Sequence, residues 1–216
     1  MRKTVLITGA ASGIGKQTAL FFASKNWTVI ATMLSLTEAQ ELLNDPTIFC
    51  YELDVTSTES ITRAQQQIMD VHHRIDVIIN NAGIGYRSFV ELSEDDKIND
   101  IVSINWLGVV KVCRAFIPVF RAQKSGLLIN ITSIAGLVNL PLGSFYHSTK
   151  QAVESFSECM AYELYDLNIK VCTVQFGNAP TAFQKNVTKC PKTGIPSYNH
   201  LMQKVSNLLL KKSDRK

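Results

Sequence analysis

A tyrosine and a lysine four residues apart, Tyr146 and Lys150, stand where we expect a helix to begin. Residues at that spacing share one helix face, so the phenol and the ammonium should project into the same space. Ser133 lies thirteen residues before Tyr146, just after the apolar run 127–131, which is typical of a buried strand. A strand end that faces a helix start would bring the three side chains together. Taken alone, such a pair is in most cases an exposed ring and a solvated lysine.

The elements that must position these side chains alternate between strand and helix. The expected strands are 3–8, 28–32, 48–53, 76–79, 127–131 and 170–174, and the expected helices are 13–24, 36–43, 58–71, about 94–122 and 144–165. Ser93 is expected to cap the long helix, whose first turn carries three acids. Repeated β-α units with continuous apolar strands predict one α/β domain, a doubly wound, Rossmann-like parallel sheet with helices on both faces.

The first β-α turn, TGAASGIG, is rich in glycine and lies between an expected strand and an expected helix. Such glycines permit a tight turn and let backbone N–H groups approach a pyrophosphate at the helix N-terminus. The spacing is G-x-x-x-G-x-G rather than G-x-G-x-x-G, and a merely structural turn is the alternative. The expected dinucleotide contacts in this turn are Gly9, Ser12, Gly13, Ile14 and Gly15.

Three further polar features follow expected strands or interrupt an apolar helix. Asp54 and Val55 follow the third strand, where the carboxylate could accept from an adenine amino group or cap a helix. The sequence Asn-Asn-Ala-Gly at 80–83 follows the fourth strand, at the edge where ligands bind in such sheets, or forms a simple turn. Asn105 is a polar residue within an apolar helix, where it could also be a core amide bonded to backbone.

Together these motifs resemble the classical short-chain dehydrogenase/reductase family over about residues 3–181. The resemblance implies binding of NAD(H) or NADP(H) and hydride transfer between nicotinamide and a carbonyl or alcohol carbon. By motif, Tyr146 would be the general acid/base and would also contact the cofactor, Ser133 would orient the substrate oxygen and Lys150 would hold the nicotinamide ribose. Asn105 would hold a water. The other implied cofactor contacts are Asp54, Val55, Asn81, Ala82, Gly83, Ala179 and Thr181.

The acid/base role requires a tyrosine with an unusual proton affinity. A free tyrosine has a pKa near ~10, a poor match for proton transfer at neutral pH. A neighbouring ammonium and an oxidised nicotinamide both favour the phenolate, so we expect the pKa of Tyr146 to be lowered.

Two departures from the family pattern concern the cofactor. The second strand ends in Met33-Leu34-Ser35, without the acid that NAD-dependent members usually place there, which slightly favours NADP over NAD. The family's Pro-Gly after the sixth strand is replaced by Phe176-Gly177, so the geometry of the loop that carries Ala179 and Thr181 is open.

The end of the chain differs from the rest in charge. Residues 1–184 contain 14 Lys and Arg against 17 Asp and Glu, whereas residues 185–216 contain 8 basic residues and one acid. We expect 1–181 to form the dinucleotide-binding catalytic part and 182–216 a basic substrate lid with a C-terminal helix of the same domain. No seventh strand is expected there. The charge could attract an acidic partner or merely solvate a terminal helix.

We expect an NAD(P)-dependent oxidoreductase that acts on an apolar ketone, aldehyde or alcohol, since residues 84–89 and 134–144 would give the pocket apolar walls. The alternative is a catalytically silent, dinucleotide-binding sensor or scaffold. By resemblance, a homodimer or homotetramer is expected. The five cysteines show no metal-type spacing and read as reduced core residues of a cytoplasmic protein. We expect no metal, no nucleic acid and no transmembrane segment.

Overall fold

Strands and helices alternate along the chain in the computed structural model, which describes residues 2–177, 187–189 and 193–213, with side chains up to residue 205. The main strands are β1 (Thr4–Ile7), β2 (Thr28–Met33), β3 (Ile48–Glu52), β4 (Val77–Asn80), β6 (Gly126–Ser133) and β7 (Ile169–Phe176). The α-helices are α1 (Gly13–Ser24), α2 (Thr58–His72), α3 (Asp95–Val102), α4 (Gly108–Gln123), α5 (Ser144–Glu163) and α6 (Pro196–Ser213). The predicted residues Ala179 and Thr181 lie outside the described residues.

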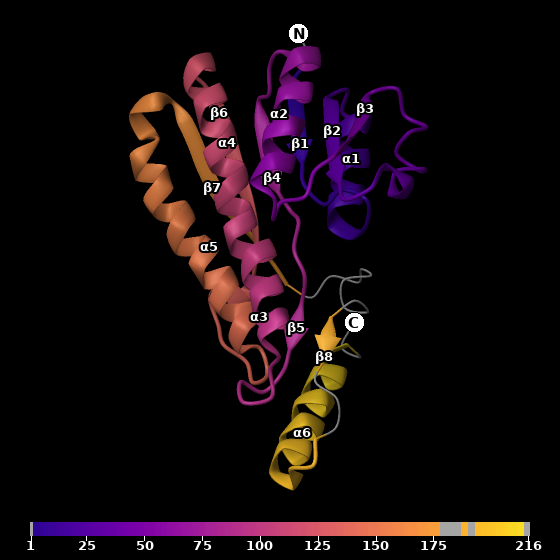
Figure 1. Cartoon of the computed structure of the whole chain (residues 1–216), viewed down its shortest axis with the longest axis vertical. Helices are drawn as coiled ribbons and strands as arrows, with labels where there is room; N and C mark the ends of the chain where they lie inside the picture. Colours follow the sequence, from indigo (N-terminus) through magenta and orange to yellow (C-terminus); the bar gives the residue numbers. More distant parts are fainter. Residues whose placement is uncertain (1, 178–186, 190–192, 214–216) are drawn as a thin grey trace.

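The six main strands form a single parallel sheet in the order β3-β2-β1-β4-β6-β7 (Figure 1). β1 lies inside the sheet, where Val5 is paired with Val29 of β2 and with Val77 of β4. The chain runs outward from β1 to β3 and then returns to β4, so the strand order reverses beside β1. In such sheets the ligand crevice lies at the carboxyl ends of the strands at this reversal.

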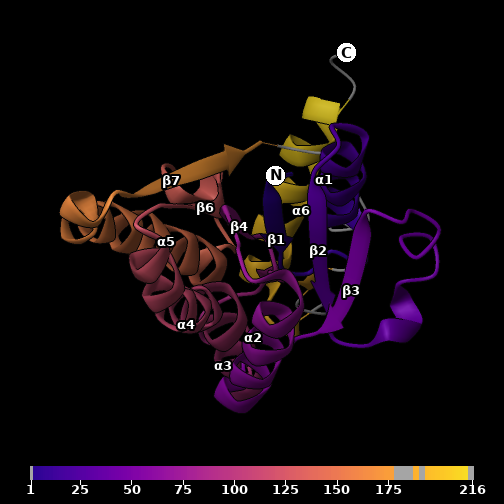
Figure 2. The same ribbon diagram turned by 90° about the horizontal axis from the view of Figure 1, so that it is seen from above.

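The predicted doubly wound α/β architecture is confirmed, although the two faces of the sheet are covered unequally. Figure 2 shows α2, α4 and α5 along one face and α1 against the other. Side chains alternate between the faces, so Leu6 and Ile78 join the core under α2 and α4, while Ile7 and Ile79 pack towards α1. The α1 face is less covered beyond β4, where Leu127, Ile129 and Ile131 of β6 are only partly buried.

A second, two-stranded sheet lies outside the main one. It pairs β5 (Tyr86–Arg87) with β8 (Thr188–Lys189) in parallel. Within the described residues, no strand extends the main sheet beyond β7. α6 lies beside β8, beyond the carboxyl edge of the main sheet (Figure 1).

The helix predicted from about residue 94 to 122 is interrupted by a π-helical turn, η2 (Ser103–Leu107), between α3 and α4. Such wide turns occur frequently at functional sites, and this one carries the buried Asn105. The prediction of Ser93 as the N-cap is wrong. Glu94 occupies that position, because the Ser93 hydroxyl donates instead to the Phe89 carbonyl oxygen at 2.7 Å.

Taken as one continuous helix, Asp95–Gln123 is long enough to cross a membrane and contains an 18-residue stretch with a mean hydropathy of 1.4. Its apolar side faces the sheet, however. Val112, Cys113, Phe116 and Phe120 are fully buried there. The apolar composition is therefore explained by core packing and is not evidence of a membrane span.

Two smaller expectations were wrong. The helix predicted over 36–43 is a short 3₁₀-helix, η1 (Leu36–Glu38), followed by turns. A segment this short has little helix stability of its own, so burial of Ala39 and Leu42 decides its path. Of the cysteines in the described residues, only Cys113 is fully buried, whereas Cys159 and Cys172 are exposed. Apolar neighbours in sequence did not predict burial, because alternate positions of α5 and β7 face solvent.

Candidate active site

The glycine-rich turn after β1 has the tight geometry that the sequence predicts. Gly9 and Gly13 have φ angles of +62° and +54°, a region that favours glycine. A Cβ at Gly15 would lie 2.4 Å from the Gly9 carbonyl oxygen and 2.5 Å from Asn81 Nδ2. The turn can therefore fold this closely only without side chains at these positions. Ser12 is the N-cap of α1, and its side chain makes no cap hydrogen bond.

Neutral side chains bind the glycine turn to the end of β4. Asn81 Nδ2 donates to the carbonyl oxygens of Thr8 and Gly9 at 2.9 and 3.0 Å. The Thr8 hydroxyl in turn accepts from the backbone N–H groups of Asn81 and Ala82 at 3.0 and 3.1 Å. Asn81 and Ala82, predicted as cofactor contacts, thus also position the turn.

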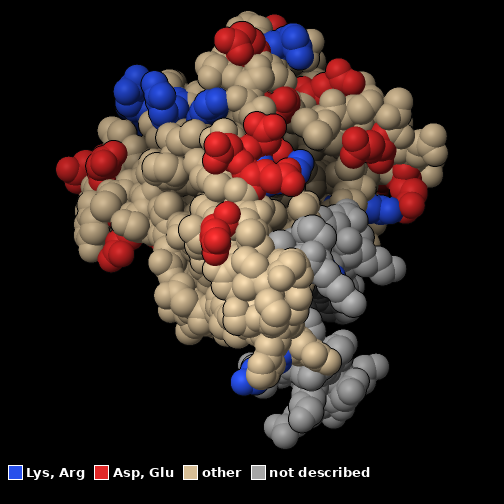
Figure 3. Space-filling model, turned by 60° about the horizontal axis from the view of Figure 1, so that its bottom comes forward, with Lys and Arg blue, Asp and Glu red and all other residues tan. Residues whose placement is uncertain are grey.

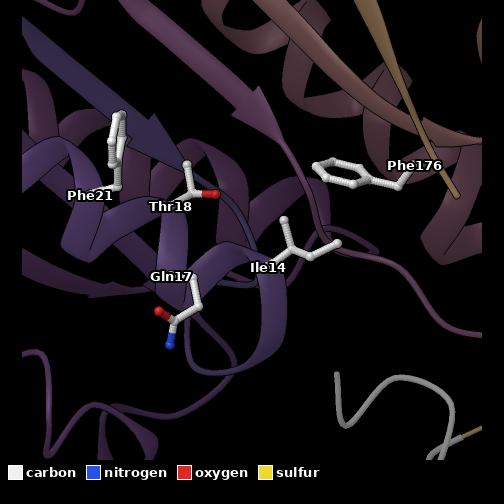
Figure 4. Close-up of a pocket in the computed structure, with 5 residues that line it drawn as sticks. All are labelled: Ile14, Gln17, Thr18, Phe21 and Phe176. Atoms are coloured by element: carbon white, nitrogen blue, oxygen red, sulfur yellow. The ribbon is translucent and has the colours of Figure 1, made fainter. Parts of the chain in front are cut away.

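A hollow of about 470 Å³ lies beside the glycine turn, lined by Ile14, Gln17, Thr18, Phe21 and Phe176 (Figure 4). Phe176 extends from the end of β7 towards Ile14. The hollow is open, and it lies over the start of α1 rather than around Tyr146. Phe176 forms one wall of this hollow.

Asp54 is engaged in a local turn at the start of α2. Its Oδ1 accepts from the Thr56 N–H at 2.8 Å and from the Thr56 hydroxyl at 2.7 Å. The helix itself is capped by Ser57, which accepts from the Ser60 N–H at 3.1 Å. Val55 packs against α4, since a Cβ at Gly108, the first residue of that helix, would lie 2.8 Å from Val55 Cγ2. Asp54 is thus held at the carboxyl end of β3.

Asn105 binds the backbone of the loop that follows β4. Its Oδ1 accepts from the Ile84 N–H at 2.8 Å, and its Nδ2 donates to the Ile84 carbonyl oxygen at 2.9 Å. A Cβ at Gly83 would lie 3.2 Å from Asn105 Oδ1 and 3.7 Å from Lys150 Nζ. The π-helical turn therefore brings Asn105, Gly83 and Lys150 together. The Asn105 amide is bonded to backbone in the core, which is one of the two roles that the sequence left open.

Ser133, Tyr146 and Lys150 converge where β6 ends and α5 begins. The Ser133 hydroxyl is hydrogen-bonded to the Tyr146 phenol and accepts from the Ala135 N–H at 3.2 Å. Lys150 Nζ lies 5.9 Å from the centre of the Tyr146 ring. The ammonium donates to the Ile131 carbonyl oxygen at 2.9 Å. The sequence therefore predicted this grouping correctly.

Burial dominates the proton affinities of both titratable groups. Burial raises the pKa of the Tyr146 phenol above its ordinary value, and the Ser133 hydrogen bond and the Arg87 charge oppose this increase. Burial lowers the pKa of Lys150 to about 8, against the charge of Glu154. Among the chain's own groups, desolvation outweighs the nearby donors and charges, so the lowering that we expect with an oxidised nicotinamide bound stays a prediction.

Arg87 and Glu154 are two charged residues that the motif analysis missed. Arg87 lies on β5, which packs against the start of α5 through the stacked rings of Tyr86 and Phe145. No local pattern in the sequence points to Arg87, because its place near Tyr146 depends on the path of the loop after β4. Glu154 had a signal, its position one helical turn after Lys150. Within the described residues, no cluster of three or more metal-ligating side chains occurs.

The loop between β6 and α5 is tied down by the helix that follows it. His147 Nδ1 is hydrogen-bonded to the Val138 carbonyl oxygen at 2.7 Å, and Gln151 donates to Asn139 at 2.8 Å. Gly143 has no room for a side chain, because a Cβ there would lie 2.3 Å from His147 Cδ2. The exposed apolar side chains of this loop are Ile134, Leu137, Val138 and Leu140.

Residues 3–192 match the short chain dehydrogenase family. The chain is 37% identical over 190 residues to a 3-ketodihydrosphingosine reductase of Bacteroides thetaiotaomicron, covering 88% of this chain and 69% of that protein. A short-chain dehydrogenase structure from Streptomyces avermitilis superimposes with a TM-score of 0.84 at 28% identity, covering 93% of this chain and 74% of the other. The structure of ElxO with NADP bound gives 0.82 at 32% identity, covering 86% and 77%. With the fold and the grouped Ser, Tyr and Lys, these matches establish that the chain belongs to the short-chain dehydrogenases and is an NAD(P)-dependent oxidoreductase.

Proposed function

We propose that Tyr146 is the general acid/base of hydride transfer between nicotinamide and a carbonyl or alcohol carbon. The bound cofactor would supply or accept the hydride. In reduction, the phenol gives its proton to the developing alkoxide while the Ser133 hydroxyl donates a hydrogen bond to the same oxygen. The observation that carries this proposal is the hydrogen bond between Ser133 and Tyr146, with Lys150 one turn away on the same helix face. In reverse, the phenolate accepts the alcohol proton.

Lys150 and Asn105 have supporting roles in this proposal. The Lys150 ammonium, held by the Ile131 carbonyl oxygen, would bind the nicotinamide ribose and favour the phenolate form of Tyr146. Asn105 would hold a water beside Lys150 while it fixes Ile84. Gly83 contributes by leaving the space between these two side chains open.

The glycine turn is proposed to bind the cofactor pyrophosphate. The implied contacts in the turn and at the neighbouring strand ends are Gly9, Ser12, Gly13, Ile14, Gly15, Asp54, Val55, Asn81, Ala82 and Gly83. The backbone N–H groups of the turn favour an anion at the N-terminus of α1, whereas the Asp54 carboxylate would accept from the adenine amino group. Ala179 and Thr181, which follow β7 in the sequence, complete the proposed set.

We propose NADP as the preferred cofactor. Met33 and Leu34 at the end of β2 offer no carboxylate to repel a 2′-phosphate. A carboxylate on the neighbouring strand, Glu52, accepts from the Leu36 N–H at 3.3 Å. Lys16, in the first turn of α1, provides a basic group that is paired with Glu41.

The proposed substrate is an apolar ketone, aldehyde or alcohol. Leu137 and Leu140, 61% and 52% exposed, lie on the loop between Ser133 and Tyr146. A relative that bears the name 3-ketodihydrosphingosine reductase is consistent with an apolar ketone. Phe89, by contrast, does not line this loop, because its ring stacks on Tyr198 with the centroids 4.0 Å apart.

Residues 182–216 are proposed to form the substrate lid of the catalytic part, residues 1–181. Three described contacts support this arrangement. Tyr198 stacks on Phe89 and donates to Glu91 at 2.5 Å, and β8 pairs with β5 beside the catalytic helix. The lid would thus be anchored to the loop that follows β4.

A homodimer or homotetramer in the cytoplasm is the remaining part of the proposal. Trp106 and Tyr162 are exposed on the long helices and could contact a second copy. Val109, Cys113 and Met160 cannot contribute to such a contact, because they are buried in the core. We propose no nucleic-acid partner. On the face in Figure 3, acidic side chains gather near the centre and basic ones form small separate groups.

The experiment is a fluorescence titration of the purified chain with NADPH and NADH, followed by turnover on a panel of apolar ketones and aldehydes. We expect tight binding of NADPH and its carbonyl-dependent oxidation. Tight binding without turnover over the whole panel would favour the sensor or scaffold alternative. Tighter binding of NADH would overturn the cofactor preference and leave the reaction in place.

A further inference from the structure

Two side chains of α5 reach adjacent residues of β6. Lys150 Nζ donates to the Ile131 carbonyl oxygen at 2.9 Å, and the carboxylate of Glu154 accepts from the Thr132 hydroxyl. Residues four apart lie on one helix face. The ammonium and the carboxylate therefore project from consecutive turns of α5 onto consecutive residues of the strand that ends in Ser133.

The carboxylate of Glu154 is held from two strands. Gln175 of β7, which is paired with Thr132, donates to Glu154 Oε1 at 2.9 Å. The glycine at position 136 leaves room for the Glu154 stem, because a Cβ there would lie 3.0 Å from Glu154 Cγ. Glu154 is thus fixed in place by β6, β7 and the turn after Ser133.

Few other charges face the Lys150 ammonium. Burial lowers the pKa of Lys150 to about 8, and Glu154 is the charged group that opposes this decrease. From the other side lie Tyr146 on α5 and Arg87 on β5, which acts on the phenol. The segments β6, η2 and η3 (Ile134–Gly136) contain no titratable side chain. The charged residues of α3 that pack near α5 are exposed, namely Asp95, Asp96, Lys97 and Asp100.

We propose that Glu154 is a positioning residue that keeps the Lys150 ammonium charged and, through Thr132, fixes the strand end that carries Ser133. This inference rests on the function proposed above and deepens it. A lysine that loses its charge near neutral pH would bind a ribose less well and would no longer favour the phenolate. Glu154 would extend the pH range in which Lys150 can bind the ribose and favour the phenolate.

The test uses Glu154→Gln, which keeps the shape and an acceptor oxygen but removes the charge. The matched control is Glu158→Gln, an exposed glutamate one turn further along the same helix. The Lys150 side chain is titrated by NMR in protein labelled with ¹³C,¹⁵N-lysine, and its signal is assigned by its loss in Lys150→Met. We expect a midpoint near pH 8 in the wild type and roughly one unit lower in Glu154→Gln. Glu158→Gln should leave the midpoint unchanged, and an unchanged midpoint in Glu154→Gln would overturn the proposal.

A second variant guards against loss of folding. Thr132→Val frees the carboxylate from β6 without altering its charge, so the Lys150 midpoint should again fall. If Glu154→Gln does not fold, an unchanged midpoint in Thr132→Val overturns the inference.

The NMR readout does not depend on activity. A shifted midpoint in a chain that turns over no substrate would overturn the proposed function and leave the charge coupling intact. Normal turnover with an unshifted Lys150 midpoint in Glu154→Gln would overturn the charge coupling and leave the proposed function intact. In the active enzyme, Glu154→Gln should move the alkaline limb of the kcat/KM profile to lower pH by the same amount, whereas a merely structural residue would lower kcat/KM at every pH.

Discussion

The turn after β1 and the end of β6 lie at the same edge of one sheet, but different kinds of interaction hold them. The glycine turn is shaped by close backbone contacts and neutral amides, such as Asn81 bonded to the Gly9 carbonyl oxygen. The end of β6 gathers a buried ammonium and a partly buried phenol, whose proton affinities are both shifted by desolvation. The first region should be sensitive to added volume and the second to charge and pH.

The largest effect should come from Tyr146→Phe, which removes the proton donor and little volume. Loss of general acid/base catalysis typically costs about 10²–10⁴-fold in rate, so turnover should fall by about 10³-fold. Cofactor affinity should change little, because the glycine turn is untouched. Turnover assays and NADPH titrations on the same preparation check both statements. Substantial residual activity would refute the role of the phenol.

Gly15→Ala tests the opposite region. The added Cβ would lie 2.4 Å from the Gly9 carbonyl oxygen, and overpacking of this kind costs about 1–3 kcal/mol. We expect NADPH affinity to fall by roughly tenfold or more, with a lower unfolding temperature. Gly194→Ala is the control, since that glycine is exposed and no described atom lies within 4 Å of a Cβ there. Equal affinities in the two variants would contradict the account of the turn.

Lys150→Met should stabilise the fold while it damages the site. The wild type buries an ammonium whose pKa is lowered to about 8, so at pH 7 the variant should unfold in urea with a free energy about 1–3 kcal/mol higher. Between about pH 8 and 10.5 the unfolded chain binds the proton that the folded chain has lost. Wild-type stability therefore rises with pH across this window, and the difference from Lys150→Met should shrink. A difference independent of pH would argue against a buried charge.

The smallest effect is expected from the loop between Ser133 and Tyr146. His147→Ala removes the hydrogen bond to the Val138 carbonyl oxygen, so the loop should order less well around a substrate. We expect KM to rise a few-fold with kcat nearly unchanged. The rise in KM should be smaller in Gln151→Ala, which removes the more exposed hydrogen bond to Asn139. A change in kcat alone would instead place His147 with the proton-transfer groups.

The sequence predicted the parts of this arrangement that depend on local pattern. The apolar runs located the six strands of the main sheet to within a few residues but not β5 and β8, and the spacing of Tyr146 and Lys150 placed them on one face of α5. Close backbone contacts were also readable, because only glycine fits at positions such as Gly15. These features are set within a few residues of chain.

The features that escaped prediction depend on contacts between distant segments. The π-helical turn around Asn105 follows from its bonds to Ile84, twenty-one residues away. Burial raises the pKa of Tyr146 among the chain's own groups, and the degree of burial cannot be read from neighbours in sequence. Arg87 approaches the phenol only because β5 packs on the start of α5.

The most direct test of the central claim is to follow the hydride itself. The wild-type chain is incubated with each C4-deuterated epimer of NADPH and with the apolar ketones, and the alcohol is analysed by mass spectrometry. We predict that one epimer delivers its deuterium to the carbinol carbon, one label for each cofactor oxidised. Cofactor that binds tightly but transfers no label to any ketone would contradict the account and leave a dinucleotide-binding protein without this chemistry.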